Sequence, residues 1–107
     1  MDESNITVKE MIHKMVHNDH DAIIVGIHSD IPILNLNAII YGTRYKYNDP
    51  EFIDTIKLRF ADSKITFFGM ELSEFVSASL HLLGVQEYAG DDLLVKNLIR
   101  SQFDFDK

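Results

Sequence analysis

The segment 70–84, MELSEFVSASLHLLG, has apolar residues on nearly every side of the helix that it predicts. At about 100° per residue, its apolar side chains form a stripe too broad for one side of a helix and leave little more than Glu74, Ser77 and His81 for water. The residues of this stripe are Leu72, Phe75, Val76, Ala78, Ser79, Leu80, Leu82 and Leu83. A helix with this pattern is usually surrounded, so we expect the other segments to pack around it.

The composition indicates one ordinary globular domain. A chain of 107 residues can bury enough surface to fold alone, and its 46% hydrophobic and 25% charged residues match globular averages. Because the sequence has no cysteine, disulfides, zinc–thiolate sites and thiol catalysis are excluded. We expect residues 1–107 to form a single helical domain with frayed ends at 1–5 and 102–107.

The N-terminal segment and the net charge bear on location and partners. The first residues, MDESNITVKE, are acidic and polar, unlike a signal peptide, and no apolar run approaches the ~20 residues that span a bilayer. A formal charge of −7 disfavours nucleic acid and anionic membranes, which bind basic faces. We therefore expect a soluble, cytoplasmic protein, and any partner should be a basic protein.

Apolar periodicity and capping residues predict six short helices. These cover approximately 7–16, 22–28, 32–45, 50–60, 70–84 and 91–100. Polar side chains and prolines mark their N-terminal ends: Asn5 or Thr7, Asp19 or Asp21, Asp30 before Pro32, and Asp49 before Pro50. The helix over 50–60 has the clearest pattern, with one apolar stripe of Phe52, Ile53, Ile56 and Phe60.

Two segments leave alternatives open. Residues 22–27 (AIIVGI) fit a short helix, but Gly26 and the β-branched residues also allow a buried strand. Residues 61–69 (ADSKITFFG) fit a loop whose Ile65, Phe67 and Phe68 pack against the core. A short strand is the alternative there, because ITFF is β-prone.

Asn37 is a polar residue on an apolar face, which it shares with Ile33 and Tyr41. A buried amide must be hydrogen-bonded, so we expect a structural bond to the backbone of a loop or a neighbouring helix. The alternative is a polar anchor that lines a pocket.

Three histidines are candidates for metal ligation. His13, His17 and His20 fall within about 60° of one another on a helix, a geometry that suits zinc or nickel. No glutamate follows the first histidine as in HExxH hydrolases, and His20 lies beyond the predicted helix end. We expect solvated surface histidines, no metal or other cofactor, and no catalytic residues.

An aromatic and basic segment is a first candidate for partner binding. It contains the residue types favoured at binding hot spots, namely Tyr41, Arg44, Tyr45 and Tyr47. The alternative is that two of the tyrosines pack in the core while Arg44 and Lys46 pair with Asp49 or Glu51.

Acidic residues supply a second candidate. Glu51 and Asp54 share the exposed side of their helix with Leu58, and Glu71 and Glu74 lie on the exposed edge of the segment 70–84. If the helices stack, these residues form one acidic surface with an apolar centre, which suits a basic protein. Ordinary solvated helix faces have much the same composition.

A weak internal repeat leads to a family resemblance. The unit from Ile33 to Asp62 recurs from Leu72 to Phe103, and the sequence DPEFI at Asp49 has a counterpart, GDDLL, about 41 residues further on, within the ~40 to 47 residues of HEAT and armadillo repeats. The sequence ASLHLLG also resembles the A-x-x-x-L-G end of such repeats. The chain thus resembles the HEAT-like helical repeats. This resemblance implies an all-α fold, with three antiparallel αα hairpins in a right-handed stack.

The resemblance also implies a function. HEAT-like proteins are mostly binding scaffolds, and a small acidic one is similar to the bacterial immunity proteins that bind and neutralise a basic, nuclease-like toxin. We expect a non-enzymatic protein-binding module of this kind, present as a monomer or homodimer. The alternatives are a metal-dependent enzyme or metal sensor that uses His13, His17 and His20, and a regulatory adaptor.

Overall fold

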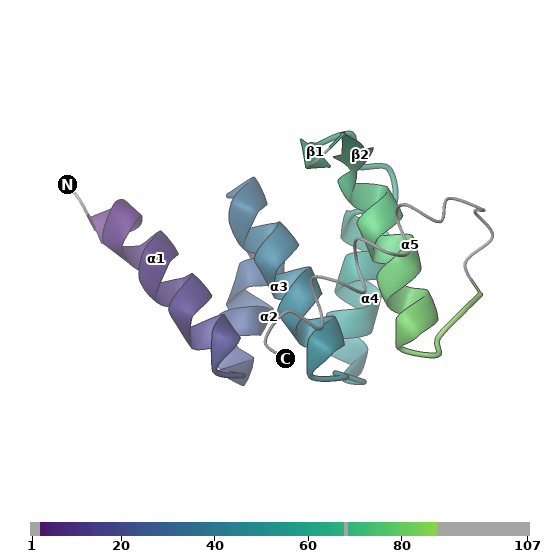
Figure 1. Cartoon of the computed structure of the whole chain (residues 1–107), viewed down its shortest axis with the longest axis horizontal. Coiled ribbons are helices and arrows are strands. Elements are labelled where there is room, and N and C mark those ends of the chain that lie inside the picture. The colour runs from purple at the N-terminus through teal and green to yellow at the C-terminus, as the bar shows by residue number, and fades with distance from the viewer. Residues whose placement is uncertain (1–2, 68, 88–107) are drawn as a thin grey trace.

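The computed structural model describes residues 3–67 and 69–87, which form five helices and one two-stranded sheet (Figure 1). The helices are α1 (Glu3–Val16), α2 (His20–His28), α3 (Pro32–Arg44), α4 (Pro50–Arg59) and α5 (Leu72–Leu82). The strands β1 (Thr66–Phe67) and β2 (Met70–Glu71) are antiparallel, with Thr66 opposite Glu71 and Phe67 opposite Met70. The predicted helical class is confirmed, while the helix predicted over 91–100 and the tail 102–107 lie outside the described residues.

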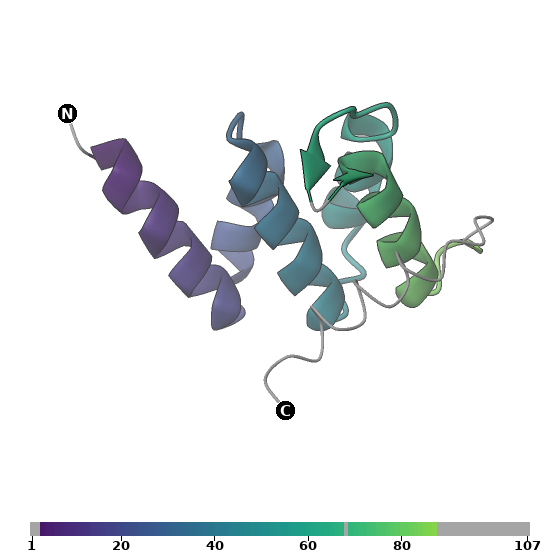
Figure 2. The same cartoon turned by 45° about the horizontal axis from the view of Figure 1, so that its top comes forward.

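The described helices form two layers. Figures 1 and 2 show α1, α3 and α5 side by side in one layer, with α2 and α4 behind them in a second. Each helix runs opposite to the one before it, so α2 and α4 point in the same direction (Figure 1). The core lies between the layers, and its largest fully buried side chains include Met15, Ile27, Ile39, Phe52 and Phe75.

The helix starts follow the predicted chemistry only in part. Residues 22–27 are helical, and Asp19 caps α2 because its Oδ1 accepts the Ala22 N–H at 3.2 Å. The first helix begins at Glu3, so the prediction of a cap at Asn5 or Thr7 was wrong. Ser, Asn and Thr are only mildly unfavourable inside a helix, so the pattern did not require a later start.

Proline marks the starts of α3 and α4 as predicted, but the neighbouring aspartates do not cap them. The N-cap residue of α3 is Ile31, which makes no side-chain cap bond, while the Ile31 N–H donates to Ser29 Oγ at 3.0 Å. Asp49 is at the N-cap position of α4 without a cap bond, and its carboxylate contacts His20 instead. An aspartate therefore has a choice of partners that the local sequence does not reveal.

The segment 70–84 is less central than its sequence indicates. Its helix buries the expected residues from Leu72 to Leu80, but Leu82 is 41% exposed because α5 ends there and Gly84 turns the chain with φ +78°. The more enclosed helix is α3, which lies between α1 and α5 and buries nine consecutive or nearly consecutive positions from Leu34 to Thr43.

The segment 61–69 contains the short strand that was the alternative for it. Phe67 packs against the core, but Ile65 is 41% exposed, so its predicted burial was wrong. Ile65 precedes the hairpin, where its carbonyl accepts the Leu72 N–H at 2.7 Å while its side chain reaches solvent. Phe68 lies outside the described residues.

The buried amide of α3 is Asn35, whereas the sequence pointed to Asn37. The Asn35 side chain is 3% exposed, and its Nδ2 donates to the carbonyls of Gly26 at 2.8 Å and Ser29 at 2.9 Å. Asn37 is half-buried and donates to Ile33 O within its own helix. Asn35 therefore fixes the C-terminal end of α2 against α3.

We expect Asn35→Ala to destabilise the chain by about 2 kcal/mol or more, because two carbonyls lose a buried donor. Chemical unfolding followed by circular dichroism measures this change. The matched control Asn37→Ala removes only a half-exposed bond within one helix and should cost well under about 1 kcal/mol. Equal losses in the two variants would contradict this assignment.

Candidate binding face

The second layer presents a mixed acidic and apolar surface on α4. Glu51, Asp54 and Leu58 are exposed, and we call these three residues the outer face. Leu58 is 81% exposed. On the other side of α4, Phe52 and Ile56 are completely buried and hold this orientation. Lys57 is exposed beside the outer face, so the surface is not uniformly acidic.

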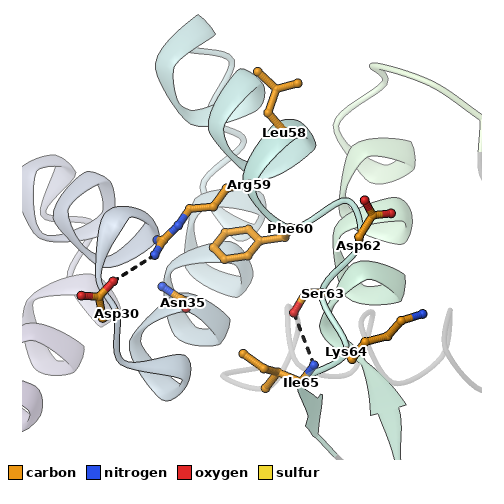
Figure 3. A pocket seen from close by; sticks show the side chains of 9 residues that line it. All are labelled: Asp30, Asn35, Leu58, Arg59, Phe60, Asp62, Ser63, Lys64 and Ile65. Carbon is orange, nitrogen blue, oxygen red and sulfur yellow. Dashed lines mark hydrogen bonds and ion pairs between the residues drawn. The ribbon is translucent and has the colours of Figure 1, made fainter.

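A groove of about 480 Å³ lies at the C-terminal end of α4 (Figure 3). Its lining comes from the α2–α3 connection, α3, the end of α4 and the segment before β1: Asp30, Asn35, Leu58, Arg59, Phe60, Asp62, Ser63, Lys64 and Ile65. Figure 3 shows the Phe60 ring between Arg59 and Asn35. Because Phe60 is 4% exposed, its ring forms part of a fixed apolar floor.

Arg59 connects this groove to α2. Its Nη1 donates to the Ile27 carbonyl at 2.6 Å, its Nη2 lies 3.4 Å from Asp30 Oδ1, and its guanidinium lies 5.3 Å from the centre of the Phe60 ring. The contact with Asp30 is on the surface, where the carboxylate is fully exposed. Such a pair contributes little stability and can exchange partners.

The groove combines apolar residues with a charged rim. Leu58 and Ile65 are exposed apolar side chains, while Asp30, Asp62 and Lys64 are exposed charged ones. Lys64 Nζ lies 3.9 Å from Glu71 Oε2. An apolar centre with a polar rim is the usual composition of a protein interface.

The predicted acidic residues fall into two groups. Since α4 and α5 run in opposite directions, Glu51 and Asp54 lie toward one end of the pair, and Glu71 and Glu74 toward the other, where the groove is (Figure 1). Glu71 and Glu74 are half-buried, whereas Glu51 and Asp54 are exposed. The groups are separated along the helices, with Leu58 and the groove on the α4 side.

The tyrosines of the aromatic segment are mainly structural. Tyr41 and Tyr47 are 6% and 8% exposed. The Tyr47 hydroxyl donates to Asn18 Oδ1 at 2.9 Å, and the Tyr45 hydroxyl donates to the Val16 carbonyl. Two tyrosines thus tie the α3–α4 turn to the α1–α2 turn. Of the four predicted residues, only Arg44 and Tyr45 are half-exposed.

The three candidate metal ligands do not converge. The rings of His13 and His17 are 4.6 Å apart on α1, but His20 begins α2 and contacts Asp49. Within residues 3–67 and 69–87, no three His, Asp or Glu side chains form a group that could hold a metal ion. The same range contains no helix that is long and apolar enough for a membrane span.

Two ionisable groups near Asp49 are perturbed. The hydrogen bond with Asp49 raises the pKa of His20, and the negative charges of Asp49, Asp21 and Glu51 act in the same direction, against a smaller lowering by burial. Burial raises the pKa of Tyr47 to about 12, with further contributions from Asp49 and Asp19. Both shifts follow from contacts between the two turns.

The sequence did not reveal three features of this region. The groove, the contact of His20 with Asp49 and the pair of His28 with Glu51 each bring together segments far apart in the chain. Their residues carry no local motif, so only the packing of α2 beside α4 makes them neighbours.

Comparison with known proteins adds no relative. No family model matches the chain, and no curated protein or solved structure matches it at a significant level.

The raised pKa of Tyr47 predicts how the stability of the fold changes at alkaline pH. Because its pKa is raised to about 12 in the folded chain, this group stabilises the fold below about pH 10 and loses that effect as pH rises toward 12. Unfolding free energies measured between about pH 9 and 11 should fall less steeply for Tyr47→Phe than for the unmodified chain. An unchanged slope in Tyr47→Phe would contradict the burial of the Tyr47 phenol.

Proposed function

We propose that this chain is a HEAT-like, non-enzymatic domain that binds a basic protein through its outer face and the adjoining groove. The two layers of antiparallel helices support a stacked-repeat architecture, because such proteins pair successive helices and stack the pairs. The net charge of −7 supports a basic partner.

The observation that carries this proposal is the exposure of Leu58. A leucine that is 81% exposed, with Glu51 and Asp54 on the same helix face, supplies an apolar contact beside acidic ones. The groove next to it offers a recess for a partner side chain, floored by Phe60. Interface energy is commonly concentrated at a few such apolar positions, while the charged rim steers association.

The most concrete form of this function is immunity against a toxin. A small acidic protein can neutralise a basic, nuclease-like toxin by covering its active face, which must itself be basic to bind nucleic acid. In this account the carboxylates of the outer face occupy positions that phosphates would otherwise take. A basic partner without toxicity would instead make the chain a regulatory adaptor.

Charge reversal tests the outer face. We expect Glu51→Lys combined with Asp54→Lys to weaken binding of the basic partner by about tenfold or more, since each reversal replaces an attraction with a repulsion. Isothermal titration calorimetry with the protein encoded next to this chain measures the effect, and co-expression measures protection from its toxicity.

The matched control is Glu10→Lys with Glu87→Lys, which changes net charge equally at exposed positions outside α4. This control should keep most of the affinity. Equal weakening by both pairs would indicate a nonspecific charge effect, and unchanged affinity after reversal at Glu51 and Asp54 would exclude the outer face.

A further inference from the structure

Two histidines of α2 meet two carboxylates at the start of α4, and we call these four residues the α2–α4 seam. His20 Nε2 contacts Asp49 Oδ2, and His28 Nε2 lies 3.4 Å from Glu51 Oε2. His20 and His28 are both about half exposed, so each can exchange protons with solvent. Glu51 belongs to the outer face as well, so the seam and the proposed binding surface share a carboxylate.

His20 is surrounded by an aromatic ring and by carboxylates. The Tyr47 ring stacks on it at 5.2 Å with an interplanar angle of 22°, and Asp21 Oδ1 lies 3.9 Å from its Nδ1. Asp49 and Glu51 are the charged groups that face it from the start of α4. His28 pairs with Glu51. The charged groups that face His20 are therefore acidic.

A further polar contact between α2 and α4 does not depend on imidazole protonation. Arg59 Nη1 donates to the Ile27 carbonyl at 2.6 Å, and arginine stays charged throughout the range in which histidine titrates. Below the seam, Ile27 and Ile56 are completely buried. The two helices should therefore stay together when the histidines are neutral, and protonation should alter chiefly the charge of the surface.

We propose that His20 and His28 are a pH-sensitive counter-charge for the outer face, which lowers its affinity for a basic partner on acidification. When both imidazoles are protonated, they neutralise Asp49 and Glu51. When they are neutral, these carboxylates are available to the partner's lysine and arginine side chains. This inference rests on the proposed function, since it concerns the regulation of the same surface.

If the proposal holds, acidification stabilises the free chain but weakens its binding to the basic partner. The raised pKa of His20 means that its contribution to folding is fully present below about pH 6.5 and is lost as pH rises through the folded value. Acid should therefore strengthen the seam in the free chain. The same protonation removes negative charge that a basic partner needs, so acid should weaken binding.

Binding measured at two pH values tests this regulation. For the unmodified chain we expect the affinity for the basic partner to fall about three- to tenfold between about pH 8 and pH 5.5, a size suited to two exposed ion pairs. The pair His20→Asn and His28→Asn should remove most of this fall. The matched control, His13→Asn with His17→Asn, removes as many histidines from α1 and should keep it. Equal pH dependence in the two double variants would overturn the proposal.

A second readout needs no partner. The stability that the free chain loses in His20→Asn/His28→Asn should be greater at about pH 5.5 than at about pH 8, measured by chemical unfolding. Nuclear magnetic resonance of the unmodified chain should give a His20 midpoint above the ordinary value of about 6.5. A midpoint at or below that value would overturn the seam even if the variants fold poorly.

These readouts separate the two proposals. If no basic partner binds at any pH, the proposed function fails, while the unfolding and resonance measurements still report whether the seam titrates as described. If the seam titrates but partner affinity stays constant with pH, the regulatory proposal fails and the proposed function stands.

Discussion

The helices pack closely at two glycines, and this close approach underlies their arrangement. A Cβ at Gly26 would lie 2.4 Å from Met15 Cε and 3.1 Å from Ala38 Cβ, so a side chain there would require the end of Met15 to move. A Cβ at Gly42 would lie 2.3 Å from the Phe52 ring. The Phe52 ring therefore packs directly against α3 at Gly42. Because Phe52 is buried on this side of α4, Glu51, Asp54 and Leu58 lie on the exposed side.

Hydrogen bonds also join the packed helices and turns. Asn35 satisfies two carbonyls at the end of α2, Tyr47 ties the α3–α4 turn to Asn18, and Arg59 holds the end of α4 to Ile27. Each of these bonds joins elements that also share apolar contacts. The described core is not fully satisfied, however, because the hydroxyls of Thr43 and Ser79 are buried without a partner. Such groups cost stability.

The sequence predicts which side chains of a helix are buried when only one face of the helix is apolar. It predicts this poorly when neighbouring elements cover most of the helix. The stripe of Phe52, Ile56 and Phe60 predicted the orientation of α4 because its opposite face is polar. In α3, burial from Leu34 to Thr43 leaves no polar face, so periodicity could not tell that Asn35, rather than Asn37, is buried. Asp49 looked like a cap because its competing partner, His20, is 29 residues away in the chain.

The sequence likewise predicts only part of the candidate binding surface. Exposure of Glu51, Asp54 and Leu58 follows from the period of α4, and the structure has all three exposed. Tyr41 and Tyr47 looked equally suited to a partner, but their burial depends on turns that periodicity does not place. The groove beside Leu58 needs residues from four segments, so it could not be predicted from any one of them.

Carboxyl footprinting of the bound chain, read by mass spectrometry, tests whether the outer face contacts the basic partner, because it locates the contact without altering any residue. The account predicts that labelling of Glu51 and Asp54 falls in the complex with the basic partner, while labelling of Glu10 and Glu87 stays as in the free chain. Unchanged labelling of Glu51 and Asp54 in a saturated complex would contradict it.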